Sequence, residues 1–127
     1  MLDPHTAAFT AIATAVRTLL GSTAVSVYPE TMANPALFPS VFVAEIDNPE
    51  TARDLSNGEN ATAPMLQIDI FSNKTSGNLT ERKSIASTID TTLRNLGYNR
   101  VMYNSNMPNI DETIKRTTMR YTTIYTS

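Results

Sequence analysis

The side chains that could carry out chemistry in this sequence are few and lie far apart. The 127 residues include one histidine, His5, and no cysteine, so a thiolate nucleophile, a disulfide and a cysteine metal site are excluded. A serine–histidine–acid arrangement would have to use His5, which lies in the expected first turn of a helix. Because terminal turns fray, such a position is seldom rigid enough for a catalytic base. We interpret His5 as an exposed residue at the start of a helix.

The carboxylates do not form a recognisable catalytic or metal-binding pattern. Four of them cluster in one polar segment: Asp47, Glu50, Asp54 and Glu59. They lack the alternating Asp/Asn spacing and the closing Glu of a calcium loop, so we interpret them as solvated charges. The four glycines include no Gly-x-Gly and no Gly-Lys-Ser/Thr, which leaves no cradle for a phosphate. We therefore expect no catalytic residue, no metal, no cofactor and no enzyme activity.

Positive charge concentrates in the last third of the chain, at Arg94, Arg100, Arg116 and Arg120. If the last strand alternates, Arg116 and Arg120 share one face, whereas Met119 and Tyr121 share the other. A platform for nucleic acid interleaves aromatic and basic side chains on one face. The opposite placement here favours pairing of the arginines with carboxylates, in the same subunit or in a neighbour. The net charge of −2 also argues against electrostatic capture of nucleic acid.

Hydrophobic spacing predicts two helices that would position these residues. The first begins at Asp3 and Pro4 and ends at Gly21, with an apolar stripe of Phe9, Ile12, Val16, Leu19 and Leu20. The second begins with Asn78 or Thr80 as its cap and ends at Gly97, with an apolar stripe of Ile85, Ile89, Leu93 and Leu96. Both helices have one apolar side, so each is expected to lie on a sheet.

Segments rich in β-branched and aromatic residues predict strands at 23–29, 40–46, 65–71, 98–104 and 112–126. Residues 1–127 are expected to form a single α+β domain, an α/β sandwich. We predict a mostly antiparallel sheet of four to five strands with both helices on one face, in the order α-β-β-β-α-β-β. A long polar loop at 47–64 would project between two of the strands. No apolar run approaches the roughly 20 residues that span a bilayer, and no basic residue precedes the apolar N-terminal segment, so we expect no membrane partner and synthesis in the cytoplasm.

The second half of the sequence has a recognisable order of motifs. A strand ends in Phe-Ser-Asn, a helix closes on Leu-Gly-Tyr, and the last strand holds an Arg-Tyr pair. The residues concerned are Phe71, Ser72, Leu96, Gly97, Tyr98, Arg100, Asp111, Arg120 and Tyr121. In this order the chain resembles the small tail-terminator, or tail-completion, proteins of long-tailed (siphovirus-type) bacteriophages. The first half agrees in element order and in the proline punctuation of "VYPETMANPALFPSVFVAEI".

This resemblance implies a structural virion protein rather than an enzyme. Such proteins form a homo-oligomeric ring, usually of six copies, that caps the completed tail tube and joins the tail to the head connector. The implied partners are copies of the chain itself, the tail tube protein and the head connector or stopper protein, while DNA passes through the lumen without specific binding. The implied location is the head–tail interface of the virion. Two alternatives stay open: a head-completion or stopper protein of the neck, and a non-viral α+β module that binds a ligand.

The same resemblance assigns roles to two groups of polar residues. The loop at 47–64 becomes a candidate docking segment for the tail tube or the next subunit, through Asn48, Glu50, Arg53, Asp54, Asn57, Glu59 and Asn60. Candidate contacts between subunits are Asp69, Arg100, Arg116 and Arg120. The sequence leaves open which face of the sheet would line the lumen.

Overall fold

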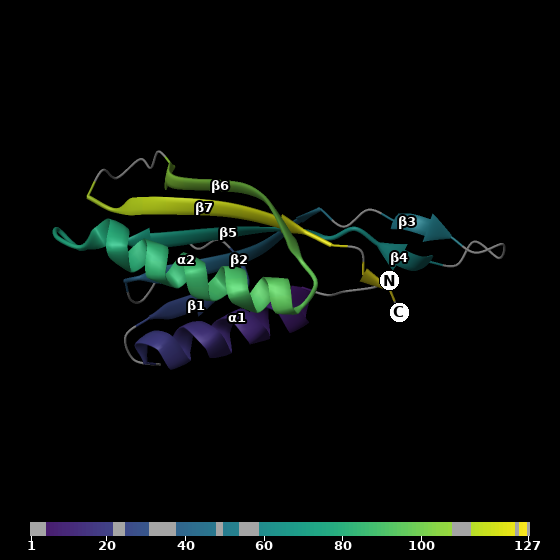
Figure 1. Cartoon of the computed structure of the whole chain (residues 1–127), viewed down its shortest axis with the longest axis horizontal. Helices are drawn as coiled ribbons and strands as arrows, with labels where there is room; N and C mark the ends of the chain where they lie inside the picture. The colour runs from purple at the N-terminus through teal and green to yellow at the C-terminus, as the bar shows by residue number, and fades with distance from the viewer. Residues whose placement is uncertain are drawn as a thin grey trace.

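The computed structural model describes residues 5–21, 25–30, 38–47, 50–53, 59–107, 113–123 and 125–126. Two helices, α1 (His5–Leu20) and α2 (Asn78–Asn95), lie side by side along one face of a five-stranded sheet (Figure 1). The strands of this sheet are β1 (Ser26–Tyr28), β2 (Ser40–Asp47), β5 (Met65–Ser72), β6 (Asn99–Met107) and β7 (Lys115–Thr122). The predicted α+β class is confirmed. No helix in these described ranges is long and apolar enough to cross a membrane.

The strands of the large sheet follow the order β1-β2-β5-β7-β6. All pairs are antiparallel except β1 with β2, which run parallel with Val27 opposite Val41. The sheet is therefore mixed but mostly antiparallel, as the sequence predicted, with one parallel pair that the sequence did not indicate. A parallel pair needs a connection longer than a tight hairpin, and residues 29–39 separate these two strands.

The hydrophobic core lies between the helices and the sheet. Leu66, Ile68 and Ile70 of β5 are all 0% exposed, which confirms the alternation expected from the sequence. Val41 and Val43 of β2 lie opposite Ile70 and Ile68 and are buried as well. Complete burial of one such side chain contributes about 1.5–3 kcal/mol. These residues fix the position of β5, and β5 in turn positions the charged residues described below.

Helix α1 packs through a narrower stripe than expected. Its buried residues are Ala8, Ile12, Ala13 and Val16, with Phe9 and Leu20 partly buried beside them. Leu19 is 44% exposed, so its assignment to the apolar stripe was wrong. The expected start of this helix at Asp3 and Pro4 lies outside the described residues.

The start of α2 differs from the prediction, whereas its end agrees with it. The residue before the helix is Gly77, at φ 75°, and no side chain caps the first turn. The Asn78 amide donates instead to the carbonyls of Ser72 and Lys74, so it holds the connection from β5 to the helix. At the other end Gly97 has φ 91°, and the Tyr98 amide donates to the Leu93 carbonyl at 2.9 Å, as expected for a left-handed cap.

The segment predicted as a loop at 47–64 contains regular structure. Strands β3 (Glu50–Arg53) and β4 (Glu59–Thr62) pair antiparallel, and β8 (Tyr125–Thr126) adds to β4 to give a second, three-stranded sheet. Figure 1 shows β3 and β4 extending past one end of the large sheet. The final strand expected over 112–126 is divided accordingly, because β7 belongs to the large sheet and β8 to the small one. These short strands were missed because they are polar and lack an apolar alternation.

Candidate functional site

The helix-free face of the sheet carries a buried carboxylate, Asp69. The register of β5 and β7 places Asp69 opposite Thr118, with Arg116 one pair further along the same face. Asp69 is 3% exposed and accepts hydrogen bonds from Arg116 Nε at 2.9 Å, Thr118 Oγ1 at 2.6 Å and Gln67 Nε2 at 3.1 Å. The expected pairing of a strand arginine with a carboxylate is thus found within one chain for Arg116. The Arg116 guanidinium also lies 5.7 Å from the centre of the Phe71 ring.

This arrangement changes the interpretation of the residues predicted to join subunits. An aspartate with so little exposure offers no surface to a neighbouring chain, so Asp69 acts as an internal partner. Arg120 is exposed and donates to Gln67 Oε1 at 3.0 Å. The Arg100 side chain is 37% exposed. Its Cζ atom lies 5.0 Å from the centre of the Tyr103 ring, and its Nη1 lies 3.8 Å from Asp90 Oδ1. For Arg100, Arg116 and Arg120, a role between subunits stays a prediction.

A second charged cluster joins α2 to β7 around Asp90. The Tyr121 hydroxyl donates to Asp90 Oδ1 at 2.5 Å, and Arg94 Nε donates to Asp90 Oδ2 at 2.8 Å. Partial burial alone would raise the pKa of Asp90, but the hydrogen bonds from Tyr121 and Arg94 outweigh it and hold that pKa below its ordinary value. Burial, followed by the bond to Asp90, raises the pKa of Tyr121 well above its ordinary value. Tyr121 therefore stays a neutral donor at any moderate pH.

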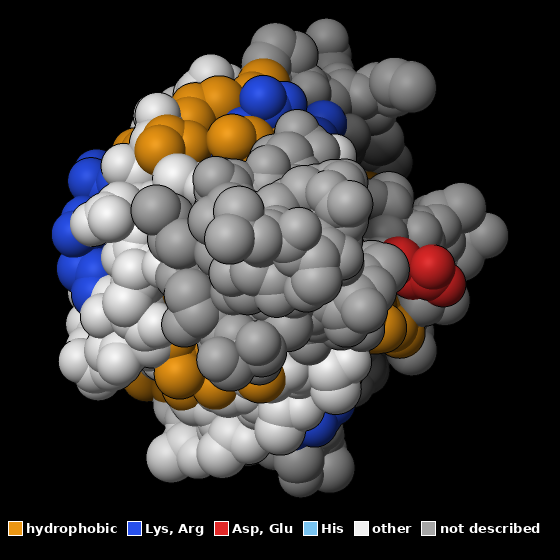
Figure 2. Space-filling model, turned by 90° about the vertical axis from the view of Figure 1, so that its right-hand side faces the viewer, with side chains coloured by type: hydrophobic (Ala, Val, Ile, Leu, Met, Phe, Trp, Pro, Cys, Tyr) orange, Lys and Arg blue, Asp and Glu red, His pale blue; other side chains and the backbone are white. Residues whose placement is uncertain are grey.

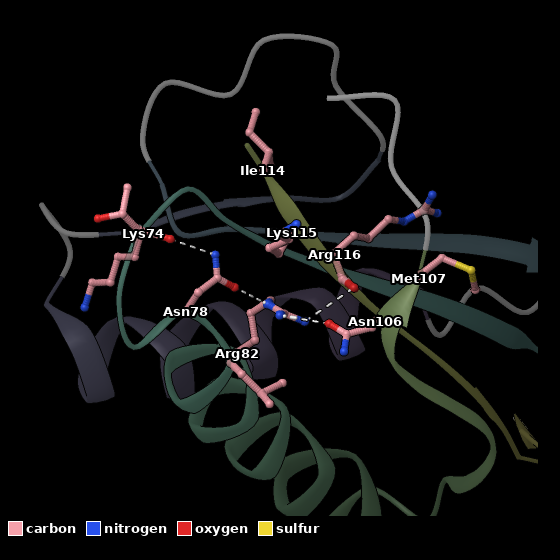
Figure 3. Close-up of a pocket in the computed structure, with 10 residues that line it drawn as sticks. Lys74, Asn78, Arg82, Asn106, Met107, Ile114, Lys115 and Arg116 are labelled. Carbon is pink, nitrogen blue, oxygen red and sulfur yellow. Dashed lines mark hydrogen bonds between the residues drawn. The ribbon is translucent and has the colours of Figure 1, made fainter. Parts of the chain in front are cut away.

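The least expected charged residue is Arg82, which is 2% exposed in the middle of the first half of α2. Its Nε donates to Asn78 Oδ1 at 2.6 Å, and its Nη1 donates to Thr117 Oγ1 at 2.8 Å and to the Ser105 carbonyl. Its Nη2 donates to Asn106 Oδ1 at 3.2 Å. Figure 3 shows the guanidinium between α2 and the ends of β6 and β7. It ties the helix to both strands.

The sequence contains a signal for the burial of Arg82. Position 82 lies on the same side of α2 as the buried Ile85, Ile89 and Leu93, because these positions are three and four residues apart. A single cation on the apolar side of an expected helix indicates a buried hydrogen-bond network.

Arg82 keeps its positive charge without a neighbouring carboxylate. All of its acceptors are neutral, and no carboxylate among the described residues forms an ion pair with it. Burial lowers the pKa of Arg82, because the charged form is removed from water. A guanidinium nevertheless remains protonated at any ordinary pH.

Arg82 lines a pocket of about 620 Å³ between the first turns of α2 and the ends of β6 and β7 (Figure 3). We call this the basic pocket, and the described residues that line it are Lys74, Thr75, Asn78, Leu79, Arg82, Asn106, Met107, Ile114, Lys115 and Arg116. Four of these are cationic and none is acidic. Lys74 pairs with Glu81 at 2.8 Å and Arg116 pairs with Asp69, so the positive charges without an acidic partner among the described residues are Arg82 and Lys115.

The residues predicted to form a docking segment fall partly outside the described chain. Asn48, Asp54 and Asn57 are outside it. Glu50 and Arg53 lie on β3, and Glu59 and Asn60 lie on β4, with Arg53 paired in register with Glu59. Their docking role stays a prediction.

His5 is not the exposed residue that the sequence suggested. It is half-buried, and its Nε2 lies 2.8 Å from the Val43 carbonyl, which can only accept a hydrogen bond. The imidazole therefore anchors the start of α1 to β2. Within the described residues, no group of three or more His, Asp or Glu is arranged to hold a metal ion.

Neither a scan against protein-family models nor a search of curated proteins gives a match. A function for this chain therefore rests on its own sequence and geometry.

Proposed function

We propose that this protein is the subunit of a structural ring that caps the completed tail tube of a long-tailed bacteriophage and joins it to the head connector. The observation that carries the proposal is the β3–β4 strand pair, which extends from one end of an α+β body (Figure 1). A closed ring repeats one heterologous interface, so each subunit needs two different complementary surfaces. A strand pair that reaches beyond the body is suited to be one of them.

The distribution of charge supports the same proposal. A ring through which DNA moves must not hold the DNA, and contacts from Lys and Arg to phosphates dominate DNA binding. Here Arg94 and Arg116 pair with carboxylates within the chain, and the net charge is −2. Both facts favour a lumen along which DNA slides.

The proposal can be tested by adding the purified protein to isolated tail tubes that lack a terminator. Electron microscopy is expected to show a ring at one end of each tube, and native mass spectrometry is expected to give a closed oligomer, with six copies the expected number. A monomer that ignores tubes would refute the proposal. Binding to DNA-filled heads but not to tails would assign the protein to the neck instead.

Deleting residues 51–61 isolates the contribution of the extending strands. Strands β2 and β5 already pair directly from Ser40 with Phe71 to Glu45 with Leu66, so the shortened connection is expected to leave the large sheet folded. Circular dichroism and thermal melting should stay close to those of the full chain, while capping of tubes is lost. Substitution of the exposed Lys83 by Ala is the matched control and should cap normally. A deletion variant that still caps tubes would contradict the role given to these strands.

A further inference from the structure

We propose that the basic pocket is a binding site for a small organic phosphate, in which one phosphate monoester is attached to a partly apolar group. This site goes beyond the ring function and does not depend on it. Three features of the described residues support it: a buried cation that no described carboxylate neutralises, a hollow lined by cations, and an apolar wall beside them.

The buried cation is Arg82, which is 2% exposed. Its described acceptors are hydroxyl, amide and carbonyl oxygens, which satisfy its donors but leave its positive charge in place. Nη2 carries two hydrogens and donates one hydrogen bond, to Asn106 Oδ1, so its second hydrogen has no acceptor among the residues that the structure describes. A buried charge is costly to the fold unless it is paired. An anion in the pocket would supply both a counter-charge and an acceptor.

The pocket gathers positive charge that its described surroundings do not cancel. Of its four cations, Lys74 and Arg116 have carboxylate partners, which leaves Arg82 and Lys115. Viewed from the opposite end of the molecule, the described Lys and Arg side chains lie in separate patches of the visible face (Figure 2). Two uncancelled positive charges match a phosphate monoester, which carries about −1.5 to −2 near pH 7. A carboxylate or a phosphate diester carries a single negative charge and would leave one cation unpaired.

The two uncancelled cations lie on the same side of the sheet, next to the start of α2. Lys115 pairs in register with Ser72 of β5, and Ser72 faces α2 because its hydroxyl donates to Glu81. Side chains opposite each other in register share a face, so Lys115 lies on the helix side, as Arg82 does. The first turn of α2 also lines the pocket, and no side chain caps it. Its uncapped backbone N–H groups and the helix dipole add to the attraction for an anion.

An apolar wall gives the pocket room for more than a phosphate. Its volume of about 620 Å³ falls within the roughly 300–1,000 Å³ of small-molecule sites. Leu79, Met107 and Ile114 line it together with the cations (Figure 3). Leu79 is 39% exposed, so an apolar group in the pocket would remove hydrophobic surface from water.

The same lining argues against nucleic acid as the ligand. Because Arg82 is 2% exposed, a phosphate must enter the hollow to approach it, whereas a duplex presents its phosphates on a wide convex surface. Single strands are held by aromatic side chains on which the bases stack, and none of the described lining residues is aromatic. A small phosphorylated molecule fits this pocket better than either form of nucleic acid.

Isothermal titration calorimetry of the full chain with three probes tests the proposal. Phenyl phosphate combines a monoester dianion with an apolar ring, inorganic phosphate lacks the ring, and methyl phenyl phosphate lacks one negative charge. Phenyl phosphate is expected to bind once per chain, and each of the other two is expected to bind about tenfold more weakly. No binding of phenyl phosphate, or a second probe that binds as tightly as it does, would overturn the proposal.

Substitutions at Lys115 and Leu79 locate the binding. Both side chains are exposed and lie outside the Arg82 hydrogen-bond network, so the variants are expected to stay folded by circular dichroism. Lys115→Gln is expected to weaken the binding of phenyl phosphate about tenfold, whereas Lys83→Gln, which removes the same charge from α2 outside the pocket, should leave it unchanged. Leu79→Ala should weaken the binding of phenyl phosphate more than that of inorganic phosphate. Equal losses for Lys115→Gln and Lys83→Gln would show a general attraction by charge and overturn the proposal.

Competition separates a small phosphate from the backbone of nucleic acid. A single-stranded oligothymidylate, added at an equal concentration of phosphate groups, is expected not to displace phenyl phosphate. Displacement would assign the pocket to nucleic acid and overturn the proposal. Binding of phenyl phosphate by a protein that does not cap tail tubes would leave this inference standing and refute only the ring function.

Discussion

The two faces of the five-stranded sheet bury a charged side chain in different ways. On the helix-free face, Asp69 is neutralised by Arg116 and receives further bonds from a hydroxyl and an amide. On the helix face, Arg82 is surrounded by carbonyl, hydroxyl and amide oxygens that carry no charge. In the Asp69 cluster the negative charge is neutralised by a cation. In the Arg82 cluster the hydrogen bonds are satisfied, but the positive charge is retained beside an open pocket. Satisfying the donors of a group and neutralising its charge are therefore separate matters in this protein.

The largest effect is expected from breaking the cluster on the helix face. Substitution of Arg82 by Met leaves acceptors of Asn78, Asn106 and Thr117 without the donor they have in Arg82. The Ser105 carbonyl also loses its bond to Arg82 but keeps the one from Thr117 Oγ1. The free energy of unfolding is expected to fall by about 3–5 kcal/mol, because more than one acceptor loses its donor and each buried group left unsatisfied costs about 1–3 kcal/mol. Urea unfolding followed by circular dichroism measures this value. Arg82→Lys keeps the charge but not the planar fork and should lie between the wild type and Arg82→Met.

A smaller effect is expected from breaking the cluster on the helix-free face. Asp69→Asn keeps the shape of the side chain but removes the charge that pairs with Arg116, whose side chain is 26% exposed and can turn to water. The free energy of unfolding is expected to fall by about 1–3 kcal/mol.

The exposed Arg120, which bonds only to the neighbouring Gln67 in the described chain, provides the control for Asp69→Asn. Arg120→Gln should stay within about 0.5 kcal/mol of the wild type. A larger loss of unfolding free energy for Asp69→Asn than for Arg82→Met would show instead that the Asp69 cluster stabilises the fold more than the Arg82 cluster does.

The smallest effect is expected from the Asp90 cluster, which is only partly removed from water. Tyr121→Phe removes one hydrogen bond and is expected to lower the free energy of unfolding by about 1 kcal/mol at neutral pH. Because the pKa of Asp90 is lowered on folding, its contribution is present above its unfolded value of about 3.9 and is lost as the pH falls further. The pKa of Tyr121 is raised on folding, so its contribution is present below about 10 and is lost as the pH rises past that value.

The difference in melting temperature between wild type and Tyr121→Phe, measured across the pH scale, isolates these two contributions. The difference is expected to be largest between about pH 5 and 9 and to shrink at both extremes. A difference in melting temperature that is constant with pH would show that the Tyr121 hydroxyl is not energetically coupled to the Asp90 carboxylate.

The fold was largely predictable because its main signals are local. The alternation of Leu66, Ile68 and Ile70 identifies a strand with one buried face without any knowledge of its neighbours. The parallel pairing of β1 with β2 was not predictable, since side-chain alternation is the same for both strand directions. Strands β3 and β4 were missed because they are short and polar and exist through pairing with each other and with β8. Residues 125–126 were expected to be extended, but as the end of the last strand and not as part of a second sheet.

For the charged residues too, local sequence patterns predicted some features, whereas others depend on pairing between distant segments. Placing Arg116 and Arg120 on one face required only the period of a strand, but naming Asp69 as the partner of Arg116 requires the register of β5 against β7. That register depends on packing between segments distant in sequence, which no local pattern encodes. The basic pocket could not be predicted either, because its wall combines residues from α2, β6 and β7, which are distant from one another in the sequence.

The continuity of the C-terminal segment has a mechanical consequence. Residues 115–126 begin at the basic pocket with Lys115 and end in β8 beside β4, so one stretch of backbone connects both ends of the molecule. Strand β7 lies between β5 and β6 and is hydrogen-bonded to both. A pull applied to β8 is transmitted along the backbone to β7, where it loads the hydrogen bonds to two flanking strands in shear rather than one at a time. A chain built in this way is expected to resist tension along its length.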